Sequence, residues 1–123
     1  MTAKPRILMV EDEALIALDL AQFLEEEGFE VLGPCMTVDD ALKTIAQHAN
    51  IDAAVLDINL GRQTAEPIAK ALVEKGIRFV AVSGYTIGQR PAIFESAPSL
   101  TKPLRPDDLI KLLRQILAAH GRE

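Results

Sequence analysis

The centre of the chain reads Ile51-Asp52-Ala53-Ala54-Val55-Leu56-Asp57, a nearly continuous apolar run that ends in a carboxylate. Such a short run, Ile51–Leu56, is typical of a β-strand covered by helices on both faces. Three more apolar runs end in polar residues: Ile7–Val10 before Glu11-Asp12-Glu13, Phe79–Val82 before Ser83-Gly84, and Ser99–Thr101 before Lys102-Pro103. If these runs are parallel strands, their ends meet at one edge of a sheet, where open α/β folds bind ligands.

Helical segments alternate with the apolar runs. The pattern predicts strands at Arg6–Val10, Phe29–Gly33, Ile51–Leu56, Ile77–Val82 and Ser99–Thr101. It predicts helices at about Glu13–Glu27, after a cap at Thr37, at about Thr64–Lys75, and after Arg105, with Ile58–Gln63 as a loop. Between Thr86 and Ala97, Gly88 and Pro91 interrupt the pattern, so only a short or distorted helix is expected. Five βα repeats imply an α/β fold with a parallel sheet and right-handed crossovers.

Helical spacing predicts which side chains face the core. In the first helix the expected face is Ile16, Leu20, Phe23 and Leu24, and Gly28 is expected to end the helix. The last helix begins with Pro106 and is strongly amphipathic. Its expected face is Leu109, Leu112, Leu113, Ile116 and Leu117.

Length and composition favour one domain, residues 1–123, without an output domain. The 123 residues are 49% hydrophobic but only 4% aromatic, so aliphatic side chains must fill the core. A formal net charge of −5 weighs against direct nucleic-acid binding, which needs a basic patch. Cys35 is a lone cysteine without zinc-ligand spacing, and no apolar run approaches the roughly 20 residues of a membrane span. A cytoplasmic protein is therefore expected, with no disulfide and no contact with a membrane.

The acidic residues at the predicted strand ends suggest a metal-dependent phosphoryl site. Asp57 follows the most buried strand, and a carboxylate there can act as a nucleophile that forms an aspartyl phosphate. Glu11, Asp12 and Asp57 would repel one another, and Mg²⁺ relieves this because it prefers carboxylate oxygens, water and phosphate. The main-chain carbonyl of Asn59 can supply a further oxygen ligand.

Two more polar residues suit the same chemistry. Lys102 offers a mobile positive charge for a phosphate oxygen, and Ser83 offers a hydroxyl donor. Each residue also has an ordinary structural interpretation. The acids Glu11-Asp12-Glu13 can cap a helix, Ser83-Gly84 can form a turn, and a lysine before proline is usually solvated.

The four motifs together resemble the receiver-domain signature of two-component response regulators. They are Val10-Glu11-Asp12-Glu13, Leu56-Asp57-Ile58-Asn59, Val82-Ser83-Gly84 and Thr101-Lys102-Pro103-Leu104. The resemblance implies a flavodoxin-like, doubly wound sheet with strand order 2-1-3-4-5. It implies that Asp57 accepts a phosphoryl group from a histidine kinase or a histidine phosphotransfer protein. It further implies that Glu11 and Asp12 hold Mg²⁺ with Asp57, that Ser83 is the switch hydroxyl, and that Lys102 contacts the phosphate.

The chain departs from the common receiver pattern at Ser99, where many receivers carry an aromatic residue. The stretch Phe79–Tyr85 instead resembles the FAT GUY subgroup of receivers, whose single-domain members lack that aromatic residue. The resemblance implies that Tyr85 acts as the switch, although a tyrosine that only packs beside the strand fits equally well. Because Thr86–Ala97 is a weak helix, phosphorylation is expected to act by shifting Tyr85–Ala97.

The sequence favours a stand-alone receiver that signals by protein–protein interaction or drains phosphoryl groups from a shared kinase. It is expected to catalyse only its own phosphorylation and dephosphorylation. One alternative is a small aspartyl-phosphate phosphatase, but Asn59 stands where such enzymes carry a second aspartate, and no cap domain is present. The other alternative is a pseudo-receiver that binds partners without phosphorylation.

Overall fold

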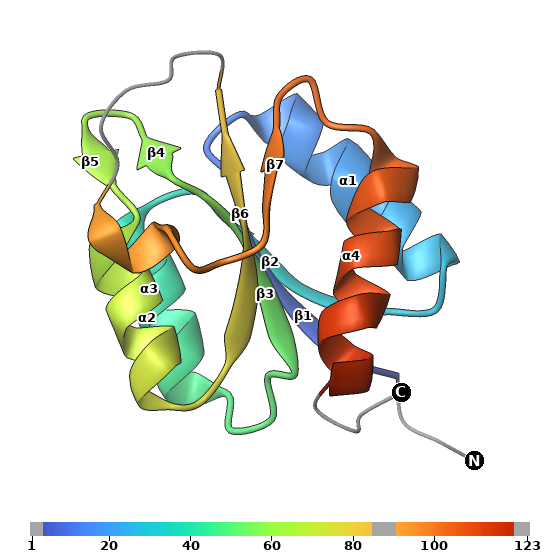
Figure 1. The fold of residues 1–123 in the computed structure, drawn as a ribbon, viewed down its shortest axis with the longest axis horizontal. Helices are drawn as coiled ribbons and strands as arrows, with labels where there is room; N and C mark the ends of the chain where they lie inside the picture. The colour runs from blue at the N-terminus through green and yellow to red at the C-terminus, as the bar shows by residue number, and fades with distance from the viewer. Residues whose placement is uncertain (1–3, 85–90, 120–123) are drawn as a thin grey trace.

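The computed structural model describes residues 4–84 and 91–119. Its central sheet has five parallel strands in the order β2-β1-β3-β6-β7 (Figure 1). The strands are β1 (Arg6–Val10), β2 (Glu30–Cys35), β3 (Ala53–Asp57), β6 (Arg78–Ser83) and β7 (Ser99–Thr101). Counted along the chain without the small hairpin described below, this is the predicted order 2-1-3-4-5. The flavodoxin-like fold is confirmed.

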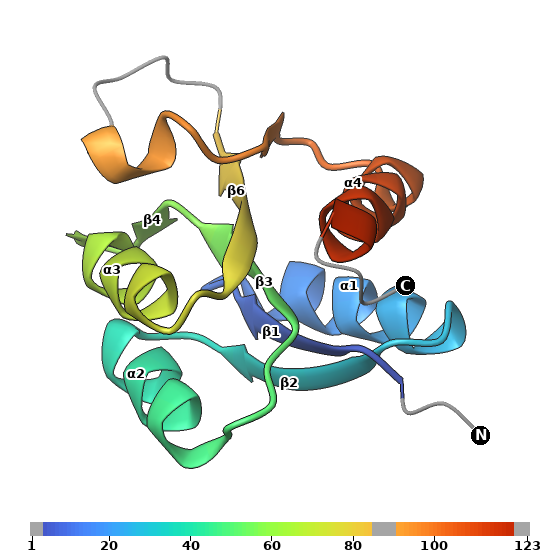
Figure 2. The same ribbon diagram turned by 60° about the horizontal axis from the view of Figure 1, so that its bottom comes forward.

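Helices cover both faces of the sheet, which makes the fold doubly wound. Helices α1 (Ala14–Glu26) and α4 (Pro106–Ala119) lie on one face, and α2 (Val38–Gln47) and α3 (Glu66–Glu74) on the other (Figure 2). Each face has its own cluster of buried aliphatic side chains, and β3 is buried along its whole length between them. In the described part of the chain, no helix has the length and apolar character needed to cross a membrane.

The segment before β7 contains one turn of 3-10 helix, η1 (Ala92–Phe94), rather than a full α-helix. This agrees with the short or distorted helix expected there. Pro91 precedes the turn, and the buried Phe94 ring packs edge-on against Phe79 with ring centroids 6.1 Å apart. Tyr85, the predicted switch, and Gly88 lie outside the described residues. The structure differs from the prediction that Ile58–Gln63 is a loop. Two short strands, β4 (Asn59–Leu60) and β5 (Gln63–Thr64), pair there as a small antiparallel hairpin.

The buried face of α1 is rotated from the predicted one. Ala17, Leu20 and Leu24 are buried, whereas Ile16 is exposed, so its predicted core position is wrong. Ala17 takes the buried position, and Ile16, one residue earlier and about 100° around the helix, faces away from the core. The other predicted features of these helices agree better. Gly28 has φ +97° just past α1, and the Thr37 hydroxyl accepts a hydrogen bond from the Asp40 N–H at 3.1 Å.

The last helix buries the predicted face in most positions. Its buried residues are Leu109, Ile110, Leu113, Ile116 and Leu117, and Leu112 is partly buried. The helix therefore presents a broader apolar face to the sheet than the sequence pattern predicts, because Ile110 joins it.

A backbone irregularity in β2 adjusts this strand to the functional edge of the sheet. The pairing of β1 with β2 shifts between Leu8, which pairs with Leu32, and Val10, which pairs with Cys35. Strand β2 thus has one extra residue in this interval, and Gly33 within it has φ +102°. After the shift, the Glu11 N–H donates to the Cys35 carbonyl at 3.0 Å. The irregularity therefore contributes to holding Glu11 at the end of β1.

We predict that Gly33→Ala destabilises the protein more than Gly28→Ala does. Both residues have positive φ, which costs a non-glycine residue about 1–2 kcal/mol. At Gly33 a Cβ would also lie 2.6 Å from the Cys35 nitrogen and 2.8 Å from the Met9 oxygen, whereas at Gly28 it meets nothing within 4 Å. Urea unfolding of both variants measures the difference. Equal losses would show that the close backbone contacts relax at little cost.

Candidate functional site

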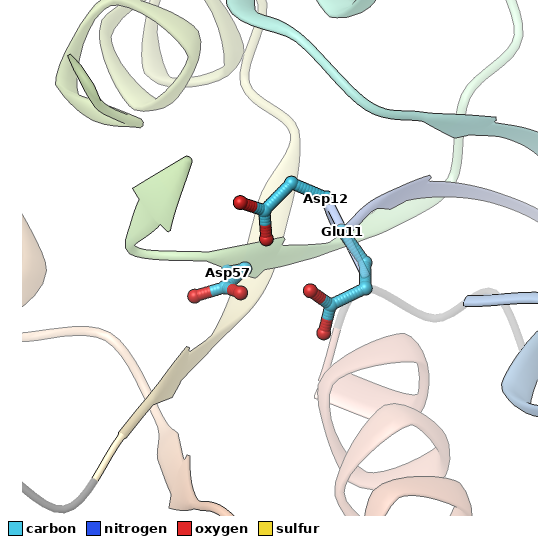
Figure 3. A group of neighbouring side chains, drawn as sticks. All are labelled: Glu11, Asp12 and Asp57. Carbon is cyan, nitrogen blue, oxygen red and sulfur yellow. The ribbon is translucent and has the colours of Figure 1, made fainter. Parts of the chain in front are cut away.

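Three acidic side chains meet at the carboxyl ends of the central strands. Glu11 and Asp12 follow β1, and Asp57 is the last residue of β3. Figure 3 shows the three carboxylates pointing toward one another, and one oxygen from each lies within 4.8 Å of the other two. The parallel alignment of β1 and β3, with Val10 beside Leu56, brings them together. The predicted acidic cluster is therefore present in the structure.

The Lys102 ammonium lies among these carboxylates. Its Nζ is 2.8 Å from Asp57 Oδ2, 3.0 Å from Glu11 Oε1 and 3.2 Å from Glu13 Oε1. Burial alone would lower the pKa of Lys102, but its hydrogen bonds to Asp57 and Glu11 raise the pKa above its ordinary value. The lysine is therefore a permanent cation that partly neutralises the acidic group.

Glu11 is the most deeply buried acid of the group, with 3% of its surface exposed. Burial and the neighbouring Asp57 raise the pKa of Glu11 to about 7, although Lys102 and the Glu13 N–H act in the opposite direction. A buried carboxylate next to another carboxylate resists ionisation. Burial is the main reason why Glu11 resists ionisation here, and the nearby Asp57 adds to it.

Backbone N–H groups orient the other two acids. The Gly61 N–H donates to Asp12 Oδ2 at 2.9 Å, and the Asn59 N–H donates to Asp57 Oδ1 at 3.2 Å. Both donors belong to the hairpin of β4 and β5, which extends from the end of β3. The hairpin thus fixes the directions of two carboxylates.

The chemistry of the donor set fits Mg²⁺. The ion prefers a few hard carboxylate oxygens together with water and phosphate oxygens, and it seldom occupies an all-protein cage. Glu11, Asp12 and Asp57 supply such oxygens at one partly open edge, and one oxygen of each lies within 4.8 Å of the others, so a single ion could contact all three. Asn59 lies at the same opening, and the use of its carbonyl as a further ligand stays a prediction.

Asp12, Glu13 and Asp57 border a shallow pocket of about 440 Å³, and the more buried Glu11 is not among its lining residues. Its described lining residues are Asp12, Glu13, Asp57, Asn59, Gly61, Gly84 and Lys102. Ser83 is not among them, although it lies next to Gly84 at the end of β6. The Ser83 carbonyl accepts a hydrogen bond from the Lys102 N–H at 2.8 Å, so backbone contact links the two predicted functional residues. The function of the Ser83 hydroxyl stays a prediction.

Sequence reasoning missed two residues of the site, Glu13 and Gly61. Glu13 belongs to the acidic motif after β1, but no part in the site was predicted for it. Its side chain forms no capping hydrogen bond and contacts Lys102 instead. Its position directly after the Glu11-Asp12 pair was an available signal. Gly61 has φ +63° in the hairpin, and its N–H contact with Asp12 spans 49 positions in sequence. Nothing in the local sequence indicates that contact.

The arrangement agrees with a known protein family. The family model of the response regulator receiver domain matches residues 7–114, which include Glu11, Asp12, Asp57, Ser83 and Lys102. This chain belongs to the response regulator receiver domain family. The receiver-domain resemblance is therefore confirmed, and the residue roles implied by the motifs stay predictions.

Similar proteins from several organisms include solved structures and regulators. The solution structure of SdrG from Sphingomonas melonis Fr1 is similar, with a TM-score of 0.80 and 39% identity over 95% of this receiver and 99% of SdrG. A CheY-like receiver from Methanospirillum hungatei JF-1 has a TM-score of 0.84 and 26% identity, covering 97% and 98% of the two chains. The transcriptional regulatory protein PdtaR of Mycobacterium tuberculosis is 30% identical over 94% of this chain. The receiver spans 62% of PdtaR, and a match to PhyR of Methylorubrum extorquens spans 43% of PhyR.

We predict that Mg²⁺ stabilises this receiver through the acidic group. At a free Mg²⁺ concentration one hundred times the dissociation constant, binding to the folded state alone adds about 2.7 kcal/mol to the free energy of unfolding. Asp12→Asn removes one ligand charge but keeps an acceptor for Gly61, so it should abolish most of this gain. Thermal melts across a Mg²⁺ titration measure it, with Asp19→Asn on the exposed side of α1 as the control. Identical titrations for wild type and Asp12→Asn would place the ion elsewhere.

Proposed function

We propose that this receiver accepts a phosphoryl group on Asp57 from a phosphohistidine of a histidine kinase or a phosphotransfer protein. The carrying observation is the environment of Asp57. Its carboxylate is 5% exposed, lies at the carboxyl end of the central strand, and has Lys102 Nζ at 2.8 Å and two further carboxylates beside it. A nucleophile, a cation and a metal-ligand set thus occur together in a receiver-family chain.

The transfer needs little covalent chemistry from the protein. A carboxylate oxygen of Asp57 attacks the phosphorus atom, and the new O–P bond forms as the P–N bond to the donor imidazole breaks. The electron pair of that bond stays on the imidazole nitrogen, which takes up a proton from solvent. Catalysis then consists of positioning the carboxylate and balancing the charge on the transferred group.

Each neighbour has a defined part in this step. The Asn59 N–H holds Asp57 Oδ1, which leaves Oδ2 on the side of Lys102. Lys102 moves its ammonium from Asp57 to an oxygen of the bound phosphoryl group, and the Ser83 hydroxyl donates to another. Mg²⁺, held by Glu11, Asp12 and Asp57, would supply charge neutralisation for the same oxygens. Water later attacks the phosphorus atom, the bond to Asp57 breaks, and inorganic phosphate leaves.

The output is proposed to be a protein–protein interaction. The acidic balance of the chain is unsuited to nucleic acid, and a receiver can also compete for phosphoryl groups of a shared kinase. The relatives PdtaR and PhyR are named as regulators, which supports a regulatory role for this chain. We propose that it acts in the cytoplasm. In this proposal the protein is a signalling module that turns over only its own phosphoryl group, rather than an enzyme acting on other substrates.

We predict that Asp57→Asn abolishes phosphoryl uptake, because the amide keeps the shape of the side chain but lacks a nucleophilic carboxylate oxygen. The protein is incubated with Mg²⁺ and acetyl phosphate or phosphoramidate, and its intact mass is measured over time. Asp39→Asn, in the exposed first turn of α2, is the matched control and should label like wild type. Full labelling of Asp57→Asn would refute the assignment of the nucleophile. Failure of wild type to label favours a pseudo-receiver, and catalytic release of phosphate from unrelated phosphoesters favours a phosphatase.

We further predict that Ser83→Ala and Lys102→Ala differ in how they impair phosphoryl uptake and the structural response to it. Loss of Lys102 removes a cation that contacts Asp57, so both phosphoryl uptake and the structural response should weaken strongly. Loss of the Ser83 hydroxyl leaves the acids and Lys102 in place, so the variant should still label while the response is reduced. Intact mass measures labelling, and hydrogen exchange with beryllofluoride measures the response. A folded Ser83→Ala protein that takes up no phosphoryl group contradicts this division.

A further inference from the structure

Glu13 differs from Glu11, Asp12 and Asp57 in its exposure and in its position at the site. Glu13 directly precedes α1, and its side chain is 58% exposed where it contacts Lys102. It does not belong to the group of three carboxylates that could share one metal ion. Its contact with Lys102 Nζ at 3.2 Å nevertheless makes it a neighbour of the phosphoryl position proposed above.

The charges of the remaining groups balance without Glu13. Glu11, Asp12 and Asp57 carry three negative charges when they are ionised. A bound Mg²⁺ supplies two positive charges and Lys102 supplies one, so this set is formally neutral. Within the described residues, the ion pair of Glu13 is made with that same Lys102, which Glu13 shares with Asp57 and Glu11. Glu13 therefore leaves one excess negative charge at the pocket opening.

We propose that Glu13 is a specificity-determining residue that slows phosphoryl uptake from small, free, anionic donors. The inference rests on the proposed function of Asp57. An entering phosphoryl donor is repelled by the Glu13 carboxylate and must also draw the Lys102 ammonium away from it. A small donor approaches with its whole negative charge exposed, whereas a protein can bring its own positive charges to the opening. The pocket thus discriminates by charge in favour of protein-borne phosphohistidine.

The expected size of the effect follows from Coulomb attraction and repulsion in water. One unit charge acting on a doubly charged donor at several Å changes a rate by about three- to tenfold at low salt, and less as salt screens it. A donor with a single negative charge should show a smaller change. The charge dependence separates this function from a purely structural one, since a structural defect would affect both donors alike.

The test compares second-order rate constants for labelling of Asp57 in full-length protein with saturating Mg²⁺. Acetyl phosphate carries two negative charges at neutral pH, and phosphoramidate carries one. Glu13→Gln should accelerate labelling by acetyl phosphate about three- to tenfold and labelling by phosphoramidate less. Added salt should bring wild type and variant together, because it screens the repulsion. Glu25→Gln removes a charge from the exposed far end of α1 and should label like wild type. Glu13→Asp keeps the charge, so its acceleration should be smaller than that of Glu13→Gln.

Two results would overturn the inference while leaving the function of Asp57 intact. One is equal rates for wild type and Glu13→Gln with both donors. The other is equal acceleration with both donors and no dependence on salt, which would mean that Glu13 only restrains Lys102. Failure of both wild type and Glu13→Gln to label with either donor refutes the proposed function itself, and the inference with it.

Discussion

The Lys102 ammonium joins the ends of strands that are far apart in sequence. The ammonium contacts Asp57 at the end of β3 and two glutamates beyond β1. The backbone N–H of Lys102 donates to the carbonyl of the last residue of β6. Buried carboxylates are costly unless a cation and hydrogen bonds compensate them. The short edge strand β7 leads directly into this lysine, so the ion pairs also tie the edge of the sheet to its centre. Sheet geometry and site electrostatics therefore depend on one another here.

The same contacts make the pocket responsive to any added charge. The Lys102 ammonium contacts three carboxylates, with that of Asp12 nearby, and burial and the neighbouring Asp57 raise the pKa of Glu11 to about 7. A bound cation would favour the ionised form of Glu11, and in the proposed function a phosphoryl group would compete for Lys102. Each change redistributes the bonds of the lysine among partners on different strand ends. A local change of charge can thus reach the backbone of β6 and β7 through Lys102 and Ser83.

The strands of the sheet could be predicted because each corresponds to a clear apolar run in the local sequence. Apolar runs bounded by polar residues gave β1 and β7 with their observed bounds, and the resemblance supplied the strand order, which no local pattern contains. The buried faces of the helices were predicted less accurately. On α1, Leu15, Ile16 and Leu18 are all exposed while the small Ala17 is buried. The irregularity at Gly33 depends on pairing with β1, which is distant in sequence. The β4–β5 hairpin is local, pairing Asn59 with Thr64 and Leu60 with Gln63, but strands of two residues are too short to show an alternating pattern.

Glu11 and Glu13 illustrate a feature of the site that sequence alone does not predict, namely which acidic side chain is buried. They are the same residue type two positions apart, and sequence places both at the end of one strand. The chain turns from β1 into α1 between them, so Glu11 is 3% exposed beside Asp57 whereas the Glu13 side chain is 58% exposed. Burial makes one a metal-ligand candidate with a raised pKa, and exposure leaves the other as a charge at the opening. The difference comes from the direction of the backbone, and that becomes visible only once the fold is known.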